Sequence, residues 1–118
     1  MPPKRIPTST QPLKNEVLLV LLALVNEPMH GYAVMQKIEE DSNGTVVLQA
    51  GAFYRLLRNM LEDGLVEERP DPERSPRDAR KRRFYRVTAR GRAVAQAALD
   101  RLAALVQTGR RSLARPAR

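Results

Sequence analysis

The sequence predicts a mainly α-helical domain with a small β-wing and a long C-terminal helix. Three observations lead to this fold class. Apolar residues recur at helical spacing in four segments, two short segments alternate apolar and charged residues as strands do, and a Pro-rich basic segment separates those two. With 118 residues, the chain is expected to form one domain over residues 13–88, followed by a helix over 89–113 and a basic tail over 114–118.

The first helix is expected to start near Leu13–Asn15 and to end at about Asn26. Its apolar run, residues 17–25, is too short to cross a bilayer, which takes about 20 residues. Because this helix is apolar on nearly all sides, we expect it at the centre of the core. The Pro-rich residues 1–12 lack the apolar stretch of a secretory signal, so we expect a disordered arm there and a cytoplasmic protein.

A second helix is expected over residues 31–41, where Tyr32, Met35 and Ile38 recur at helical spacing. Three acids and a Ser-Asn-Gly breaker end it. The β-branched segment that follows, residues 45–49, predicts a brief strand.

The third helix has the clearest pattern, and Gly64 is placed to end it in a left-handed conformation. Its apolar stripe runs along positions i, i+3, i+4, i+7 and i+8, which are Phe53, Leu56, Leu57, Met60 and Leu61. At about 100° per residue, Gly51, Arg55 and Arg58 point away from the stripe, and Tyr54 and Asn59 flank them.

Residues 65–69 and 83–87 predict the two strands of a hairpin whose loop is too long for a tight turn. In the second strand, Tyr85 and Val87 are expected to turn toward the core. Thr88 is suited to cap the last helix. That helix would be about 37 Å long. Because a small core cannot cover this length, we expect it to pack on a second copy of the chain through Val94, Ala98, Leu102, Leu105 and Val106.

The basicity of the chain is concentrated in one place. Residues 74–92 hold nine Arg or Lys and one Asp, so this segment alone accounts for the net charge of +8 of the whole chain. A local basic patch suggests a polyanion partner. From the charge alone, nucleic acid, an anionic lipid surface and a merely solvated loop all stay open.

Three helices followed by a two-stranded wing is the winged helix-turn-helix arrangement, in which the third helix would enter the major groove of DNA. Arg can pair with guanine or with phosphate, and Tyr can donate to phosphate or contact a thymine methyl group. Gly51 would let the start of the helix approach the DNA backbone. The DNA contacts expected on this helix are Gly51, Tyr54, Arg55, Arg58 and Asn59.

Residues 21–40, 51–68 and 82–92 also resemble, in order and spacing, three motifs of the PadR family of bacterial transcriptional regulators. The resemblance covers about residues 13–110. It implies a winged-helix repressor that dimerises through its C-terminal helix, in a family whose members often respond to small molecules such as phenolic acids or drugs. It assigns the recognition-helix Gly and Tyr to Gly51 and Tyr54, the basic wing residues to Lys81, Arg82 and Arg83, and the His-Gly-Tyr opening of the second helix to His30, Gly31 and Tyr32.

Two details follow from the resemblance. Tyr32 becomes a further expected DNA contact. The family's Thr after the Gly is Ala52 here, which removes a hydroxyl suited to cap the helix or to bind phosphate.

Other classes of function lack support in the sequence. The chain has no Cys and a single His, so neither a disulfide nor a metal site is expected, and no cofactor is implied. It has no Gly-rich phosphate loop and no convincing Ser-His-acid set, so we expect no enzyme. The leading hypothesis is a sequence-specific regulator that binds double-stranded DNA, a dimeric repressor relieved by a small-molecule effector. A non-specific nucleic-acid-binding module and a winged-helix protein–protein adaptor are the alternatives.

Overall fold

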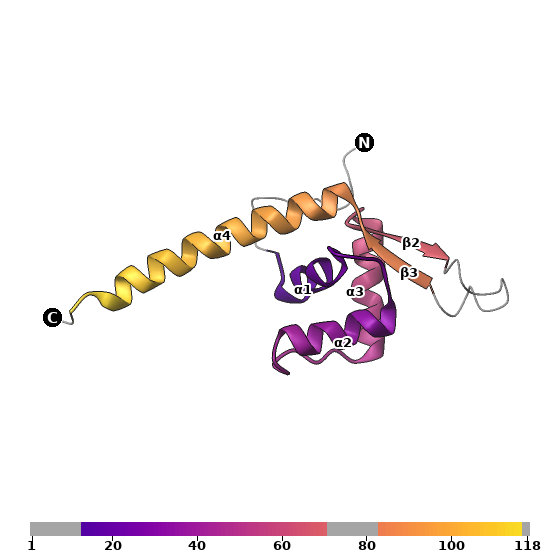
Figure 1. Ribbon diagram of the computed structural model, residues 1–118, viewed down its shortest axis with the longest axis horizontal. Coiled ribbons are helices and arrows are strands. Elements are labelled where there is room, and N and C mark those ends of the chain that lie inside the picture. The colour runs from indigo at the N-terminus through magenta and orange to yellow at the C-terminus, as the bar shows by residue number, and fades with distance from the viewer. Residues whose placement is uncertain (1–12, 71–82, 117–118) are drawn as a thin grey trace.

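The computed structural model describes residues 13–70 and 83–116. Its elements are α1 (Asn15–Leu24), β1 (Met29–His30), α2 (Gly31–Asp41), α3 (Ala50–Glu62), β2 (Val66–Pro70), β3 (Arg83–Val87) and α4 (Ala89–Ala114). Figure 1 shows the first three helices packed together, the hairpin at one end and α4 extending away from them at the other. The predicted fold class, mainly α-helical with a β-wing and a long last helix, is confirmed. Residues 1–12, predicted as an N-terminal arm, residues 71–82, which include Lys81 and Arg82, and residues 117–118 of the predicted basic tail lie outside the described residues.

The core is built around α1, as its apolar character predicts. The side chains of Val20 and Leu21 are fully buried. The stripe of α3 packs on the core through Phe53, Leu57 and Met60, which are fully buried as well. On the sheet side the core is closed by Val66, Tyr85 and Val87, so the predicted inward orientation of the last two is confirmed.

The strand expected over residues 45–49 is wrong. This segment leaves a turn in which Asn43 and Gly44 are left-handed, with φ of 53° and 79°. The Val46 N–H donates to the Ser42 hydroxyl at 3.0 Å, which uses a donor that a strand would offer to its neighbour. Val46 and Leu48 still pack against the core. Val47 between them is exposed. The β-branched composition of this segment therefore reflects partial burial and not strand pairing.

The third strand of the sheet is β1, which no sequence pattern predicted. The antiparallel order is β1-β3-β2, and β1 pairs Met29 with Tyr85 and His30 with Phe84. The His30 and Phe84 rings lie 4.3 Å apart, centroid to centroid. Because β1 has only two residues and directly follows Pro28, it leaves no alternation that a sequence pattern could detect.

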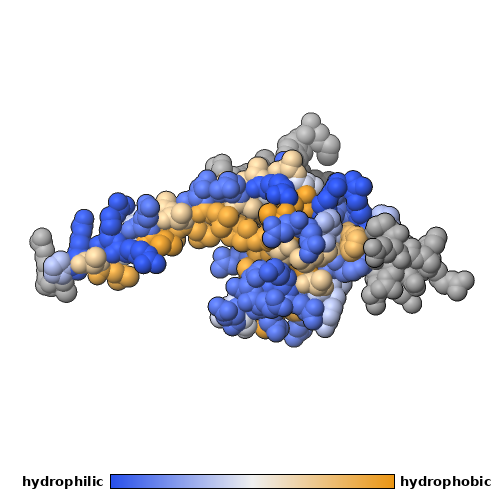
Figure 2. Space-filling view, in the orientation of Figure 1, coloured by the Kyte–Doolittle hydropathy of each residue, from blue (hydrophilic) through white to orange (hydrophobic). Residues whose placement is uncertain are grey.

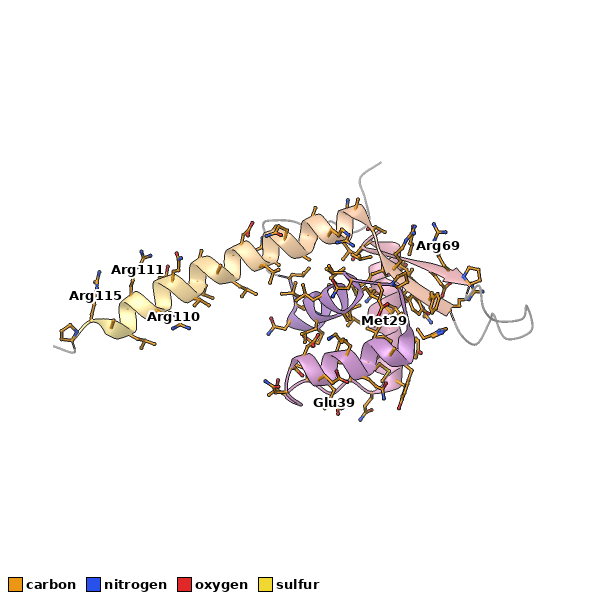
Figure 3. The ribbon with its side chains drawn as sticks, viewed as in Figure 1. Met29, Glu39, Arg69, Arg110, Arg111 and Arg115 are labelled. Carbon is orange, nitrogen blue, oxygen red and sulfur yellow. The ribbon has the colours of Figure 1, made fainter. Side chains whose placement is uncertain are left out.

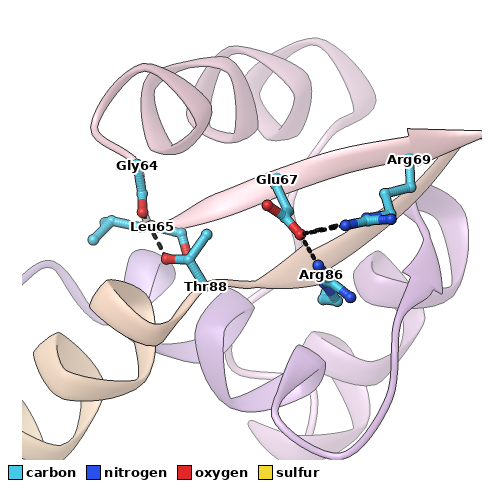
Figure 4. Close-up of polar contacts among 6 residues, drawn as sticks. All are labelled: Gly64, Leu65, Glu67, Arg69, Arg86 and Thr88. Atoms are coloured by element: carbon cyan, nitrogen blue, oxygen red, sulfur yellow. Dashed lines mark hydrogen bonds and ion pairs between the residues drawn. The ribbon is translucent and has the colours of Figure 1, made fainter.

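The end of α3, the start of β2 and the start of α4 meet at Thr88 (Figure 4). The Thr88 hydroxyl donates to the Gly64 carbonyl at 2.6 Å and accepts from the Gly91 N–H at 2.9 Å, which confirms the predicted cap. Its backbone N–H donates to the Leu65 carbonyl at 3.0 Å. Gly64 ends α3 with φ of 75°, the left-handed conformation predicted for it. One residue thus joins the helix that carries the polar face, the wing and the long helix.

Candidate nucleic-acid interface

The third helix, α3, has one buried and one exposed face. Its apolar stripe lies in the core, and Gly51, Arg55 and Arg58 are exposed on the other side, as the helical period predicts. Tyr54 is 44% exposed on the same side, and Asn59 is partly buried beside it. The structure therefore brings together the five residues expected on this helix, on a surface that carries two guanidinium groups and one phenol. Gln49, at the N-cap position, makes no side-chain capping bond, so the first N–H groups of α3 have no side-chain cap from it.

The start of α2 lies against this surface. A β-carbon placed on Gly31 would be only 2.6 Å from the Tyr54 hydroxyl oxygen, so the phenol of α3 rests on the first turn of α2. The next residue, Tyr32, is 69% exposed. The resemblance-based assignment of Tyr32 is therefore compatible with an accessible side chain next to the start of α3.

The described part of the wing is held by ion pairs between its two strands (Figure 4). Glu67 on β2 pairs with Arg86, which lies directly opposite on β3, and also with Arg69, at 3.4 Å. On the other face of the hairpin, Glu68 accepts a hydrogen bond from the Tyr85 hydroxyl at 3.2 Å and lies 3.6 Å from a guanidinium nitrogen of Arg83. Each acid thus binds more than one partner.

These contacts shift two pKa values. The Arg86 guanidinium, which donates a hydrogen bond to Glu67, lowers the pKa of that carboxyl group below its usual value. Burial, reinforced by the nearby Glu68 carboxylate, raises the pKa of Tyr85 to about 12. Glu67 is therefore ionised and Tyr85 is a neutral donor at any pH near 7.

These ion pairs change which basic residues contribute unbalanced positive charge. Arg83 and Arg86 are balanced in part by Glu67 and Glu68, to which the sequence pattern assigned no role. The remaining excess of basic residues is therefore contributed by residues 74–82, which stand between the two strands in the sequence. The pairing of Glu67 could have been predicted from the sequence, because antiparallel pairing of residues 66–70 with residues 83–87 places Glu67 opposite Arg86. That alignment depends on the register, which a loop of this length does not determine.

The long helix α4 exposes apolar residues beyond the part that covers the core. Figure 2 shows them as a continuous hydrophobic band along one side of α4, from the domain toward the free end. Leu105 is 65% and Val106 50% exposed, and Leu102 is also exposed. By contrast, Ala98 is buried within its own chain and Val94 packs against the same core. Leu99 and Leu113 extend the exposed band beyond the residues predicted for it.

A pocket of about 210 Å³ opens where this band meets the start of α1. It is largely apolar, and Arg101 adds a cation to its lining. The residues that line it are Leu13, Asn15, Leu18, Ala98, Arg101, Leu102 and Leu105. Further along, Arg110 and Arg111 project from the last turns of α4, and Arg115 directly follows its last residue (Figure 3).

Residues 13–70 and 83–116 contain neither a candidate metal site nor a candidate membrane-spanning helix. No three His, Asp or Glu side chains there are grouped as a metal site. None of the helices in this part of the chain combines the length and the apolar character needed to cross a membrane.

Three packed helices, a β-hairpin wing and a polar, cationic outer face on the third helix define the winged helix-turn-helix class of DNA-binding proteins. Residues 19–97, well over half of the chain, match the PadR-like family of transcriptional regulators. The chain therefore belongs to the PadR-like family, whose members are DNA-binding transcriptional regulators and not enzymes.

Solved structures share this fold. A PadR family transcription regulator from Clostridium difficile R20291 is 18% identical with a TM-score of 0.68, and the alignment covers 82% of this chain and 96% of that one. A PadR family regulator from Eggerthella lenta DSM 2243 is 25% identical with a TM-score of 0.69, covering 86% and 83%. The PcaV regulator from Streptomyces coelicolor, solved with its natural ligand, is 22% identical with a TM-score of 0.65, covering 83% and 61%. No curated protein matches the chain.

Proposed function

We propose that the protein is a dimeric repressor that binds a specific double-stranded DNA operator and is released from it by a small-molecule effector. The observation that carries this proposal is the exposed face of α3, where Gly51, Tyr54, Arg55 and Arg58 stand opposite an apolar stripe anchored in the core by the fully buried Phe53, Leu57 and Met60. A helix anchored in this way presents a fixed set of side chains to a groove. Because the operator is in the chromosome, the protein would act in the cytoplasm.

The exposed band on α4 supports the dimer. Leu99, Val106 and Leu113 follow one another at seven-residue intervals, with Leu102 between the first two, which is the spacing by which two helices pack against each other. A second copy of the chain would cover these side chains and bring two α3 helices to the same DNA. The operator would then contain two related half-sites.

The proposal is tested by finding the DNA. Immunoprecipitation of the protein with its bound DNA, followed by sequencing, identifies the enriched fragment. A gel-shift titration then compares that fragment and the gene's own upstream region with random duplex. We expect preferential binding of at least about 10³-fold for the enriched fragment. Equal affinity for all duplexes would replace this proposal by the non-specific nucleic-acid module, and absence of binding to any of them by the protein–protein adaptor.

The wing is expected to contact phosphates through Lys81, Arg82 and Arg83. Replacing all three by Ala should lower the slope of log affinity against log salt by about 0.9 for each phosphate that the wing no longer neutralises. The measurement is the operator affinity at several salt concentrations. The matched control replaces Arg110, Arg111 and Arg115, which carry the same total charge at the far end of α4 (Figure 3). An unchanged slope in the wing variant would show that the wing does not bind DNA.

The pocket beside α4 supports the effector part of the proposal. It is largely apolar, Arg101 is the one charged residue that lines it, and Leu102 and Leu105 belong both to it and to the proposed dimer face. A small aromatic acid fits this chemistry, and PcaV is a structural neighbour that was solved with its natural ligand. A panel of phenolic acids added to the gel-shift reaction tests the point. If none releases the operator, phenolic acids are removed from the proposal.

A further inference from the structure

Gly31 occupies a position where glycine is not required by the backbone. Among the described glycines, only Gly44 and Gly64 have positive φ. Gly31 is the first residue of α2, and Ala is the better helix former there. What distinguishes Gly31 is its neighbour. A β-carbon on it would lie 2.6 Å from the Tyr54 hydroxyl oxygen and 3.1 Å from each of two carbons of the same ring. The missing side chain makes room for the phenol of Tyr54.

Tyr54 is confined on a second side as well. Its ring lies 5.0 Å, centroid to centroid, from the buried ring of Phe53 in an edge-to-face arrangement with an interplanar angle of 76°. The remainder of the ring is open to solvent on the face of α3 that carries Arg55 and Arg58. The phenol thus lies where α2 and α3 approach one another.

We infer that Gly31 is a specificity-determining positioning residue of the DNA interface. It does not itself contact DNA. Because Gly31 has no side chain, the Tyr54 ring can lie against the first turn of α2, and this contact keeps the phenol in one direction before DNA binds. Tyr54 then loses little side-chain entropy when the protein binds the operator. This inference rests on the proposed operator binding and adds to it a residue of α2 that acts through a residue of α3.

The close approach of Tyr54 makes a specific prediction for Gly31→Ala. The added methyl group displaces the phenol, because the hydroxyl oxygen and two ring carbons occupy its place. We expect operator affinity to fall about tenfold, the reduction typical of removing one base contact. Affinity for random duplex should change less than twofold, because non-specific binding depends on phosphate contacts. A purely structural role of Gly31 would weaken both kinds of binding together.

A double-mutant cycle tests the coupling. Gel-shift titrations on the enriched operator fragment and on random duplex compare wild type, Gly31→Ala, Tyr54→Ala and the double variant. If Gly31 acts through Tyr54, then Gly31→Ala changes operator affinity less than twofold once Tyr54 is Ala. As a matched control, Arg58→Ala removes another proposed base contact without touching Gly31, and Gly31→Ala should keep its full effect in that background. The inference is overturned if Gly31→Ala is equally harmful with and without the Tyr54 ring, or if it binds like wild type.

Should Gly31→Ala alone not fold, the comparison uses Tyr54→Phe with and without Gly31→Ala. Without the hydroxyl, the nearest ring atom lies 3.1 Å from the new methyl group, a contact that a small shift of the ring relieves. The Ala variant is still expected to bind the operator more weakly than Tyr54→Phe alone, and equal binding would overturn the inference. If wild type itself does not prefer the operator over random duplex, the proposed function fails. If wild type does and Gly31→Ala matches it, only this inference fails.

Discussion

Gly91→Ala is expected to destabilise the folded protein by about 3 kcal/mol or more, enough to lower Tm by more than about 10 °C. A β-carbon at this position would lie 2.1 Å from the Leu65 carbonyl oxygen and 2.8 Å from a methyl carbon of Val87. Trimming Val87 cannot relieve the first contact, because the carbonyl belongs to the backbone. The start of α4 must therefore move away from β2. That movement strains the hydrogen bonds that Thr88 makes on both sides of the junction.

Thermal unfolding followed by circular dichroism measures this effect. Gly51→Ala is the matched control, since an added β-carbon there meets no atom within 4 Å and Gly51 also lies in the first turn of a helix. We expect the control to retain or slightly raise the wild-type Tm, because Ala favours helix over Gly by about 1 kcal/mol. A Gly91→Ala protein that melts within 2–3 °C (roughly 0.5 kcal/mol) of wild type would contradict the close packing at this junction.

Leu105→Glu is expected to convert the proposed dimer to monomers while leaving each chain folded. Leu105 is 65% exposed in the single chain, so a charge there lowers the stability of the isolated fold only slightly. In a dimer built on α4 the same carboxylate would be buried against an apolar surface with no partner, which is strongly unfavourable. Because the two DNA-binding domains would no longer be linked, operator affinity should fall by about 10²- to 10⁴-fold.

Sedimentation and gel-shift titration measure the two consequences of Leu105→Glu separately. Gln107→Glu is the matched control, because it adds the same charge about 200° away around the helix, on an exposed position. It should stay dimeric and bind DNA nearly as wild type does. If Leu105→Glu still sediments as a dimer at micromolar concentration, α4 is not the dimer interface.

Much of the fold could be predicted from the sequence because periodicity and turn chemistry are local. The second helix and the second strand of the wing begin and end where the patterns predicted them, at Gly31–Asp41 and Arg83–Val87. The same reasoning was wrong for residues 45–49, because a β-branched segment can pack partly against the core without a strand beside it. It could not find β1, whose two residues become a strand only because β3 passes next to them.

The candidate site also has one part that the sequence predicts and one part that it does not. Which residues of α3 face outward follows from the helical period, so Tyr54, Arg55 and Arg58 could be selected from the sequence. The contacts between elements could not. That Gly31 makes room for Tyr54, and that Glu67 and Glu68 bind the arginines of β3, depends on a crossing of helices and on a strand register, and neither leaves a periodic pattern in the chain.

Only one residue, Thr88, separates β3 from α4, and this has a mechanical consequence. No linker is available there to absorb a rotation, and the hydrogen bonds of Thr88 join the strand and the helix to the end of α3 as well. A rotation of α4 about its first turn therefore rotates α3 and the wing with it, as one rigid body. A change of only a few degrees in the direction of α4 would reorient the proposed DNA-binding surface without any rearrangement inside the domain.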